Sequence, residues 1–403
     1  MTTSTAATGI KAGIRQSAWR PREEDDGSAL GGIRVLELAA IIAGAYSGML
    51  LADFGADVIK VEHPNGDPFR HLGNKREGTA VDWKRIGRNK RLVALDLHDP
   101  DAQELVRQLA AEADVVTENF RPGRLEEWGL GYDELSRDNP GLVMLRVTGW
   151  GQDGPHKDRP GFGSVAEAMA GFAAVNGEKG GHPLLPPFGL ADHISGIYGA
   201  FSIMTALTES RRSGKGQVID LAIYECMFSV MGGMALDYDQ FGFVQQRSGN
   251  RVHYSSPRNV YETSDGRFVA LSGSTPNIFR RIMISIERPE LVNDPKFIDN
   301  TARLKNADEL DQLIAGWINT HPFDDVLRVF GANEVALAPV QDISQIFEDE
   351  QFIARGAITS VEDEEWGTLR MPGVFPRLSR TPGKIRWAGR KVGQDDNEVF
   401  VTR

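Results

Sequence analysis

Residues 33–62, IRVLELAAIIAGAYSGMLLADFGADVIKVE, contain the pattern that decides the fold. The first six residues form a short β-branched segment that follows the pair Gly31-Gly32, which predicts a strand. The middle of the segment has apolar residues at helical spacing and stops at Gly55, and residues 57–62 predict a second strand. A strand, a helix and another strand in this order predict parallel strands joined by a helix that packs on their sheet.

The same alternation continues along the first half of the chain. We predict further strands at residues 91–97, 114–119, 142–148 and 217–221. Helices are predicted at residues 99–113, 123–138, 165–174 and 192–212. The last of them has an apolar stripe formed by Ile194, Ile197, Phe201, Met204 and Leu207. Alternating strands and helices predict an α/β fold, with a Rossmann-like parallel sheet covered by helices.

Changes in composition predict the domain boundaries. After Cys226 a Met-, Gly- and Phe-rich connector leads to paired strands with an Asp265-Gly266 hairpin turn, followed by helices at residues 276–287 and 307–321. We therefore predict a smaller α+β domain at residues 230–335, beside a large α/β domain at residues 31–229. Residues 1–30 are predicted to form a flexible or partner-embracing N-terminal arm. Residues 336–403 are predicted to return to the large domain.

The composition excludes several classes of protein. The 403 residues include 41% hydrophobic and 25% charged side chains, which is ordinary for a globular chain. The net charge of −11 argues against a nucleic-acid binder. No apolar run reaches the roughly 18 residues that a membrane span needs, and the N-terminus lacks the apolar core of a secretory signal. The single cysteine, Cys226, leaves no internal disulfide and no thiolate zinc site, so we expect a cytoplasmic protein.

Common catalytic motifs are missing from the sequence. There is no dinucleotide fingerprint after the first strand, no P-loop and no G-x-S-x-G elbow, and the eight histidines show no metal-ligand spacing. One basic cluster fits either a solvated charged face or a site for a small anionic ligand. Its members are Lys75, Arg76, Lys84, Arg85, Arg88, Lys90 and Arg91.

Asp192 follows a proline-rich loop and opens the predicted helix at residues 192–212. Two interpretations fit this position. Aspartate is a favoured N-cap residue and needs no further role there. A carboxylate at a helix N-terminus is also suited to be a nucleophile, because the positive field keeps it ionised and nearby N–H groups can steady an oxyanion.

Seven motifs in order carry a resemblance to a known family. They are GIRVLEL at residues 32–38, LADFGADVIKVE at 51–62, NKRLVALDL at 89–97, ENFRPG at 118–123, GWGQDGP at 149–155, ADHISGIYG at 191–199 and SGKGQVID at 213–220. With these motifs the chain resembles the family III CoA-transferases over most of residues 30–380. That family includes formyl-CoA transferase, carnitine CoA-transferase and the 2-methylacyl-CoA racemases.

The resemblance implies an enzyme whose nucleophile is Asp192. The carboxylate would attack an acyl-CoA thioester to give a mixed anhydride, and CoA would return to give an aspartyl thioester that a second carboxylate resolves. CoA would be a co-substrate, with no tightly bound cofactor and no metal. The resemblance also implies an interlocked homodimer, and the segment GFGSVAEAMAG at residues 161–171 is similar to members that use succinyl-CoA and C4 or C5 dicarboxylates.

The resemblance further implies a set of CoA contacts. These are Ile42, Ala43, His63, Leu95, Asp96, Leu97, His98, Asn119, Phe120, Arg121, Arg124, Gly161, Phe162 and Gly163. His63 and Glu127 stand where basic residues are common in the family, so we expect Arg121, Arg124 or the basic cluster to bind the phosphates instead. His63 also fits a simple turn residue, and Phe120 a core residue.

Two departures from the family separate the possible activities. The racemases have a histidine base in a G-H-D triplet, and this chain has Gly161, Phe162 and Gly163 there. Proton exchange on both faces of an α-carbon needs two acid/base groups, which favours transfer over racemisation. The covering glycine loop of formyl-CoA transferases is reduced to Ser272-Gly273-Ser274. The alternatives are a racemase with a different base and a non-catalytic CoA-binding protein.

Overall fold

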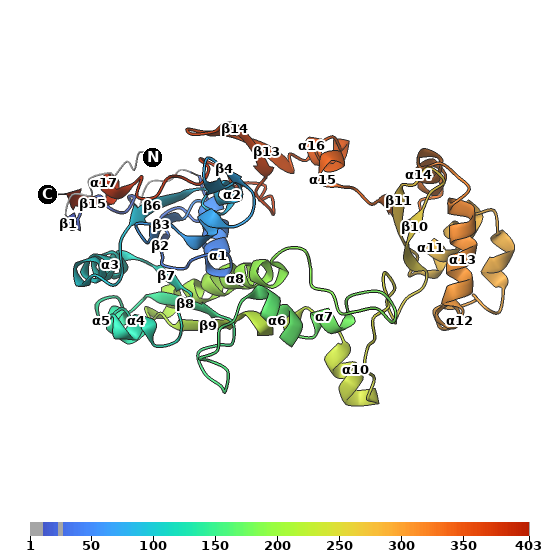
Figure 1. Cartoon of the computed structure of the whole chain (residues 1–403), viewed down its shortest axis with the longest axis horizontal. Helices are drawn as coiled ribbons and strands as arrows, with labels where there is room; N and C mark the ends of the chain where they lie inside the picture. Colours follow the sequence, from blue (N-terminus) through green and yellow to red (C-terminus); the bar gives the residue numbers. More distant parts are fainter. Residues whose placement is uncertain (1–10, 23–26, 403) are drawn as a thin grey trace. The chain divides into compact units, whose positions relative to one another are not determined.

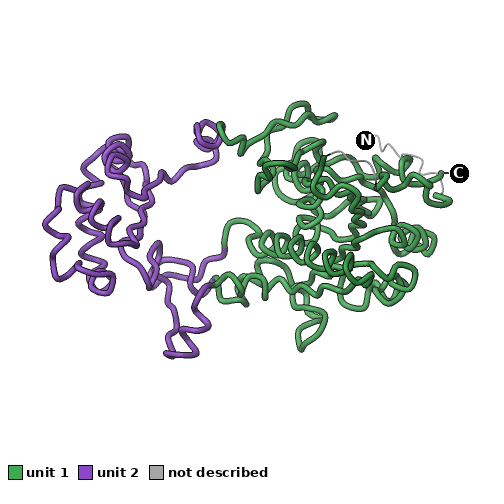
Figure 2. Tube along the Cα trace, turned by 180° about the vertical axis from the view of Figure 1, so that it is seen from behind, with its two compact units in different colours: residues 1–172, 186–231, 353–403 green, residues 173–185, 232–352 purple. Residues whose placement is uncertain are grey.

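The computed structural model describes residues 11–22 and 27–402 (Figure 1). It divides into two compact units, which Figure 2 shows in different colours. Unit 1 takes the chain up to residue 172, then residues 186–231 and the part from residue 353 onward. Unit 2 takes residues 173–185 and 232–352. Residues 336–352, which we predicted to return to the large domain, therefore cluster with unit 2.

A six-stranded parallel sheet forms the centre of unit 1. Its order is β6 (Lys90–Ala94), β3 (Asp57–Glu62), β2 (Arg34–Glu37), β7 (Val115–Glu118), β8 (Val143–Thr148) and β9 (Val218–Ala222). In the register, Leu36 of β2 lies opposite Ile59 and Val116. The first of these strands along the chain lies in the middle, so the connections change direction between β2 and β7. The predicted Rossmann-like α/β fold is confirmed, and its strand order is the doubly wound one.

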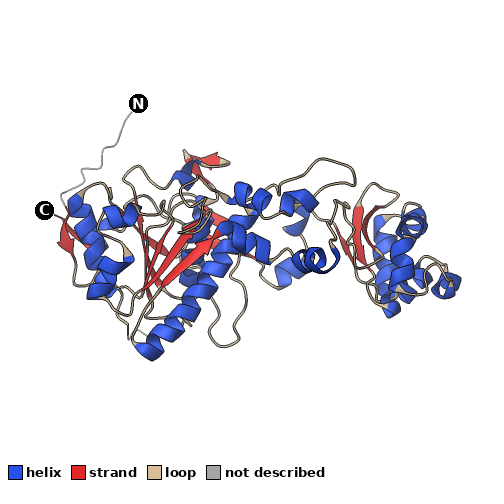
Figure 3. Ribbon diagram, turned by 90° about the horizontal axis from the view of Figure 1, so that it is seen from below, coloured by secondary structure: helices blue, strands red, loops and turns tan. Residues whose placement is uncertain are grey.

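Helices cover both faces of this sheet (Figure 3). Side chains alternate along β2, so Leu36 packs with α3 (Pro100–Glu112), α4 (Arg124–Glu127) and α5 (Tyr132–Asp138), and Val35 packs with α1 (Ala43–Asp53) and α8 (Leu190–Ser213). The second face also holds α6 (Gly163–Met169) and α9 (Ile223–Ser229). The five strands from β6 to β8 are thus buried on both sides, whereas the edge strand β9 is partly exposed.

The buried face of α8 differs from the predicted stripe. Ile197 and Phe201 are 55% and 68% exposed, and the residues that face the core are mostly small. The reason is the close crossing of α1 and α8. A Cβ on Gly199 would lie 2.3 Å from Oγ of Ser47, and that hydroxyl donates to the Gly196 carbonyl at 3.0 Å. Small residues therefore form most of the inward face of this helix, together with Ile203 and Leu207, while Ile197 and Phe201 point outward.

The described part of the predicted N-terminal arm packs against unit 1. β1 (Lys11–Ile14) pairs antiparallel with β15 (Phe400–Thr402), and Trp19 is buried in the core beneath α3. Residues 1–10 and 23–26 of the predicted arm lie outside the described residues. Within residues 11–22, then, the chain is part of the large unit.

Unit 2 contains a three-stranded antiparallel sheet and several helices. β10 (Arg258–Glu262) and β11 (Phe268–Ser272) form the predicted hairpin, and β12 (Leu337–Pro339) pairs with β11. The helices around its core are α11 (Pro276–Ser285), α12 (Asn300–Lys305), α13 (Ala307–Ile318) and α14 (Phe323–Ala332). We did not predict α14. Two further helices of this unit are α10 (Met234–Phe241) and α15 (Ile343–Ile346).

The remaining elements are short. They are β4 (Lys75–Arg76), β5 (Thr79–Ala80), α2 (Trp83–Ile86), α7 (Phe172–Val175), α16 (Glu350–Ala354), β13 (Ile358–Asp363), β14 (Gly367–Pro372), α17 (Asp396–Val399) and the 3-10 helices η1 (Pro68–His71) and η2 (Pro289–Asn293). Across the residues that the structure describes, no helix combines the length and apolar character needed to cross a membrane.

Candidate active site

A pocket of about 200 Å³ opens at the carboxyl ends of the parallel strands, where the strand order reverses between β2 and β7. Doubly wound folds bind their ligands at this position. Its wall comes from the loops that follow β2, β7 and β8 and from the start of α8 and α9. The lining residues are Ile41, Ile42, Ala43, Asn119, Phe120, Arg121, Pro122, Val147, Thr148, Gly149, Trp150, Lys157, Arg159, Pro160, Gly161, Phe162, Asp192 and Ile223.

Asp192 is the acidic residue of this wall, and it does not cap α8. The helix begins two residues earlier, at Leu190, its N-cap is Gly189, and Asp192 is the third helical residue. The capping interpretation of Asp192 is therefore wrong. The free N–H of Ala191, in the same first turn, instead donates to Oε1 of Glu167 at 3.0 Å. Glu167 comes from α6 and is 1% exposed.

The electrostatics of Asp192 also differ from the expectation that it is easily ionised. Burial, together with the charge of Glu167, raises the pKa of Asp192 to about 6, and a hydrogen bond from the Gly163 N–H only partly opposes this rise. At pH 7 a group with this pKa is still ionised in a ratio of about 10 to 1. A poorly solvated carboxylate is more basic than an ordinary aspartate, and it remains charged at neutral pH.

Two glycines leave room beside this carboxylate. A Cβ on Gly163 would lie 2.4 Å from Oδ2 of Asp192, and a Cβ on Gly189 would lie 3.0 Å from the same atom. Any side chain at residue 163 would compete with the carboxylate for its place. The backbone itself therefore forms this part of the wall, and only glycine lets it approach so closely.

The loop after β2 is held in a strained conformation next to the pocket. Ile41 has a φ of 66°, a region that β-branched residues rarely adopt and that costs about 1–3 kcal/mol. Its N–H donates to the carboxylate of Asp67 at 3.1 Å. The neighbouring loop after β7 is tied to it, since Asn119 and Ala40 exchange two hydrogen bonds of 2.8 Å. Both walls of the pocket are thus fixed to each other.

A buried charge network supports that loop from below. Nζ of Lys60 contacts Asp67 at 2.9 Å and Glu37 at 3.1 Å and donates to the Ala39 carbonyl, while Lys90 pairs with Glu37 at 2.8 Å. Burial alone would raise the pKa of Asp67, but Lys60 and the N–H groups of Phe69 and Ile41 hold it below its usual value. Asp67 is therefore a charged acceptor, which suits a strong hydrogen bond to the strained Ile41.

Most of the predicted CoA contacts are brought together. Ile42, Ala43, Asn119, Phe120, Arg121, Gly161 and Phe162 line the pocket, and Gly163 bonds to Asp192. His63, Asp96 and His98 form an exposed cluster, in which Asp96 lies 2.8 Å from Nδ1 of His98 and 3.8 Å from Nε2 of His63. The ring of Trp128 joins the two groups, because it meets Phe120 at 5.3 Å and His98 at 5.4 Å.

Three of the predicted contacts are placed less favourably. The side chains of Leu95 and Leu97 belong to the core beneath α3, so only their backbone can face a ligand. Arg124 pairs with Glu127 at 2.6 Å and lies over the ring of Trp128.

The basic cluster predicted as a phosphate site is mostly buried and paired. The pairs are Lys84 with Asp363, Arg85 with Asp82, Arg88 with Asp53, Lys90 with Glu37 and Arg91 with Asp57, all at 2.6–2.8 Å. Lys84, Arg88, Lys90 and Arg91 are buried and paired, and Arg85 forms a local pair, which argues against a phosphate role for these five side chains. Lys75 and Arg76 are exposed, and Arg76 lies 3.7 Å from Glu77.

Sequence reasoning missed four residues of this region. Lys157, Arg159 and Trp150 line the pocket, and Glu167 sets the charge around Asp192. The first three lie in the irregular glycine- and proline-rich stretch, where the basic residues of HKDR were the available signal. Glu167 lies within the segment at residues 161–171 that suggested a substrate class, but sequence alone gave no reason to place it beside Asp192.

Metal ligation finds no support in the described ranges 11–22 and 27–402, where no three His, Cys, Asp or Glu side chains gather closely enough to hold an ion. Cys226 is free and packs in the core that α8 covers.

Comparison with known proteins gives a consistent result. Residues 30–396 match the family model described as CoA-transferase family III. The chain is 41% identical to the succinyl-CoA–D-citramalate CoA-transferase of Chloroflexus aurantiacus, over 94% of both chains. It is 35% identical to the succinate–glutarate CoA-transferase of Agrobacterium fabrum, over 92% of this chain and 95% of that one. The crystal structure of a CAIB/BAIF family protein from Brucella suis matches with a TM-score of 0.81 at 33% identity, covering 92% of this chain and 98% of that one.

Proposed function

This chain belongs to CoA-transferase family III and is a CoA-transferase, and from that premise we propose that Asp192 is its nucleophile, that succinyl-CoA is its donor and that a C4 or C5 dicarboxylic acid is its acceptor. The observation that carries the proposal is the pocket at the strand-order switch point, where a poorly solvated carboxylate faces a wall of glycine backbone. The relatives whose names give succinyl-CoA or succinate as a substrate support the donor.

The proposed reaction needs only the two substrates. An Asp192 oxygen attacks the thioester carbonyl, the C–S bond breaks, and CoA leaves as a thiolate from a mixed anhydride. The thiolate then attacks the aspartyl carbonyl, the anhydride C–O bond breaks, and succinate departs. The acceptor carboxylate attacks the resulting aspartyl thioester, and the same two steps in reverse release the new acyl-CoA. Thioester energy is kept throughout, so no ATP is consumed.

Three exposed cations at the pocket support CoA binding. Arg121, Lys157 and Arg159 line the pocket, and none of them forms an ion pair with a carboxylate of residues 11–22 or 27–402. We propose that they bind the phosphates of CoA in place of the buried basic cluster. The exposed surface at His98 and Trp128, next to Phe120, would then be available to the adenine ring, because aromatic faces stack well on bases.

Racemisation, the alternative activity, lacks a base at the expected place. Phe162 lines the pocket with a side chain that is 61% exposed, and it cannot accept or donate a proton.

Trapping separates the candidate activities. The protein is incubated with succinyl-CoA and then with hydroxylamine, and peptides are examined by mass spectrometry. A transferase gives a hydroxamate on Asp192, whereas a racemase exchanges the α-proton of a 2-methylacyl-CoA with deuterated solvent. A panel of dicarboxylate acceptors, followed by the new CoA thioesters formed, then identifies the second substrate. Efficient exchange without any adduct on Asp192 would contradict the proposal.

The pKa of Asp192 predicts a pH dependence. Because the nucleophile must be ionised and its pKa is raised to about 6, kcat/KM should fall about tenfold per pH unit below pH 6 and level off above pH 7. Replacing Glu167 by Gln removes the neighbouring charge that, together with burial, raises this pKa, so the acid limb should move to lower pH. Rates measured between pH 4.5 and 8 in both proteins test this, and a limb near the ordinary aspartate pKa of about 4 would refute the assignment.

We also propose that the chain works as a homodimer. α8 turns Ile197, Phe201 and Met204 outward into an apolar groove of about 970 Å³ in unit 1, which Phe54 and Phe375 also line. Contiguous exposed apolar surface of this kind marks interaction sites on proteins. Light scattering should give twice the mass of one chain, and Phe201→Asp should lower it towards one chain while leaving the circular dichroism spectrum unchanged.

Because acyl-CoA is the co-substrate, the proposed compartment is the cytoplasm.

A further inference from the structure

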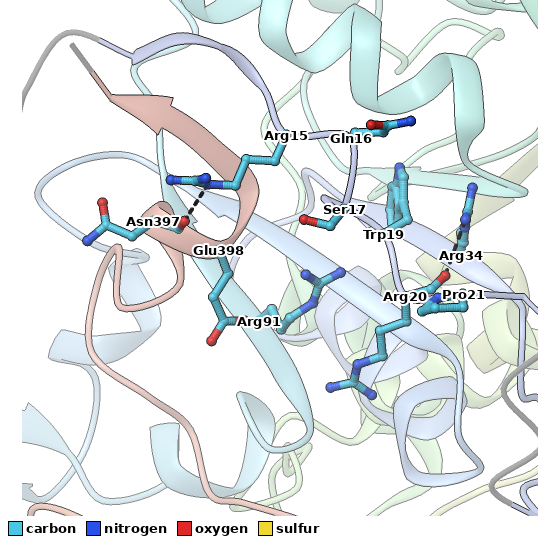
Figure 4. A pocket seen from close by; sticks show the side chains of 10 residues that line it. All are labelled: Arg15, Gln16, Ser17, Trp19, Arg20, Pro21, Arg34, Arg91, Asn397 and Glu398. Atoms are coloured by element: carbon cyan, nitrogen blue, oxygen red, sulfur yellow. Dashed lines mark hydrogen bonds between the residues drawn. The ribbon is translucent and has the colours of Figure 1, made fainter.

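A second pocket of unit 1 lies at the amino ends of the parallel strands, whereas the pocket with Asp192 lies at their carboxyl ends. Arg34 and Arg91 line it from the starts of β2 and β6, the segment from Arg15 to Pro21 forms one wall, and Asn397 and Glu398 of α17 form another (Figure 4). Its volume is about 690 Å³, and small-molecule sites have roughly 300–1,000 Å³. It shares no lining residue with the active-site pocket, so it is a separate place on the protein. We call it the arginine pocket.

Positive charge exceeds negative charge around the arginine pocket. Arg91 pairs with Asp57 at 2.6 Å, and Arg20 shares the same carboxylate at 3.7 Å, so one aspartate faces two guanidinium groups. Arg34 pairs with Glu112, which lies outside the lining. Among residues 11–22 and 27–402, four arginines thus face Asp57, Glu112 and the lining residue Glu398, which leaves one positive charge unmatched.

Arg15 uses only one of its guanidinium nitrogens for hydrogen bonds within the described residues. Its Nε donates to the carbonyls of Asn397 and Phe400 at 2.7 and 3.0 Å, and its side chain forms no ion pair with any carboxylate of the described residues. Figure 4 shows its guanidinium group beside Asn397, on the same side of the pocket as Glu398. Arg20 likewise uses only its backbone N–H and the long Nε contact to reach Asp57. The two terminal nitrogens of each of these guanidinium groups are left for a further acceptor, and two parallel N–H groups are the geometry that binds a phosphate or a carboxylate.

Two buried donors in the same wall lack acceptors. Nε1 of Trp19 and Nε of Arg34 are shielded from solvent and have no hydrogen-bond partner within residues 11–22 and 27–402. Trp19 is 4% exposed, and both side chains line the arginine pocket. Buried N–H groups are almost always paired in folded proteins, so two orphans beside one cavity point to an acceptor that binds there.

We propose that the arginine pocket binds a small organic anion with two negative charges, carried by a phosphate group or by two carboxylates. Arg15 and Arg20 supply the free guanidinium edges, and Trp19 and Arg34 supply the orphaned donors. Glu398 is the carboxylate in the pocket wall. Its negative charge repels the anion and therefore lowers the affinity. The proposal does not depend on the identity of the CoA donor or acceptor.

Calorimetric titration of the full chain tests the proposal with inorganic pyrophosphate, inorganic phosphate and succinate as separate probes. Saturating CoA is present in each titration to keep the active-site pocket filled. We expect one of the probes to bind, and the probe preferred shows whether phosphate or dicarboxylate chemistry fits. Arg15→Gln combined with Arg20→Gln should weaken that binding at least tenfold, and raising the salt concentration should weaken binding to the unaltered chain.

Two matched variants make the result decisive. Glu398→Gln removes the opposing charge and should tighten binding severalfold, which a damaged fold could not do. Arg137→Gln, an exposed arginine of α5 that lies outside the pocket, should leave binding unchanged. The proposal is overturned if no probe binds at millimolar concentration in the presence of CoA, if the arginine variants bind as well as the unaltered chain, or if Glu398→Gln has no effect.

Discussion

Asp192→Ala should lower the rate of CoA exchange by a factor on the order of 10⁴ or more, as expected when a covalent nucleophile is removed. The hydroxylamine adduct should disappear at the same time, because Asp192 is the only carboxylate among residues 11–22 and 27–402 that lines the pocket. Exchange is measured with succinyl-CoA and the best acceptor from the panel, and CoA binding is measured separately. Binding should survive, since the proposed phosphate contacts of Arg121, Lys157 and Arg159 are untouched.

The same variant should not be less stable at pH 8. A raised pKa means that the folded protein holds the ionised carboxylate at a cost, and this cost is present above the folded pKa of about 6 and fades as the pH falls towards the unfolded value near 4. Removing the group should therefore preserve or raise the melting temperature at pH 8. Asp133→Ala is a suitable control, because Asp133 is an exposed acidic residue in the first turn of α5. Near-normal exchange by Asp192→Ala would exclude the proposed nucleophile.

Gly163→Ala should reduce kcat/KM by on the order of 10²-fold, although it adds a single methyl group. The new Cβ would lie 2.4 Å from Oδ2, 2.8 Å from Cγ and 3.1 Å from Oδ1 of Asp192, so the carboxylate must move. The backbone of Gly163 has no left-handed φ, and alanine is compatible with the first position of α6. The loss should therefore come from the displaced nucleophile rather than from a strained backbone.

Gly316→Ala provides the matched control for this substitution. Gly316 lies within α13, and a Cβ there would meet no atom within 4 Å. Alanine is the better helix former by about 1 kcal/mol, so the control should keep full activity and gain slightly in stability. If Gly163→Ala proves as active as Gly316→Ala, either the space beside Asp192 is larger than described or that carboxylate takes no part in the reaction.

The strained loop at Ile41 shows how the large unit prepares this pocket. A β-branched residue at a φ of 66° persists only where neighbouring groups over-determine its conformation. Here Asp67 accepts the Ile41 N–H, and Lys60 holds both Asp67 and the Ala39 carbonyl. The buried charges thus fix the backbone that meets the substrate, and they do so below the pocket, without contacting it.

Local patterns predicted the strands of the parallel sheet and the main helices of the large unit, although the helix predicted at residues 123–138 is in fact two helices, α4 and α5. The strand at residues 57–62 was predicted with the observed bounds, and the helix at residues 99–113 differs from α3 by one residue at each end. Periodicity acts over neighbouring residues, so it is readable without the fold. Periodicity failed for α8, where Ile197 and Phe201 fit a buried stripe but are exposed. The reason is that the close contact between this helix and Ser47 of α1 determines which face is buried.

The sequence by itself determined the α/β class and the family and predicted Asp192 as the nucleophile, because each rests on short motifs that keep their order along the chain. Only the tertiary structure decided what surrounds that carboxylate. Glu167 accepts a hydrogen bond from Ala191, which lies 24 residues further along the chain. Asn119 accepts one from Ala40, and these two residues are 79 positions apart in the sequence. Burial and charge act through space, so the pKa of Asp192, the pairing of the basic cluster and the open arginine pocket follow from the fold and not from spacing in the chain.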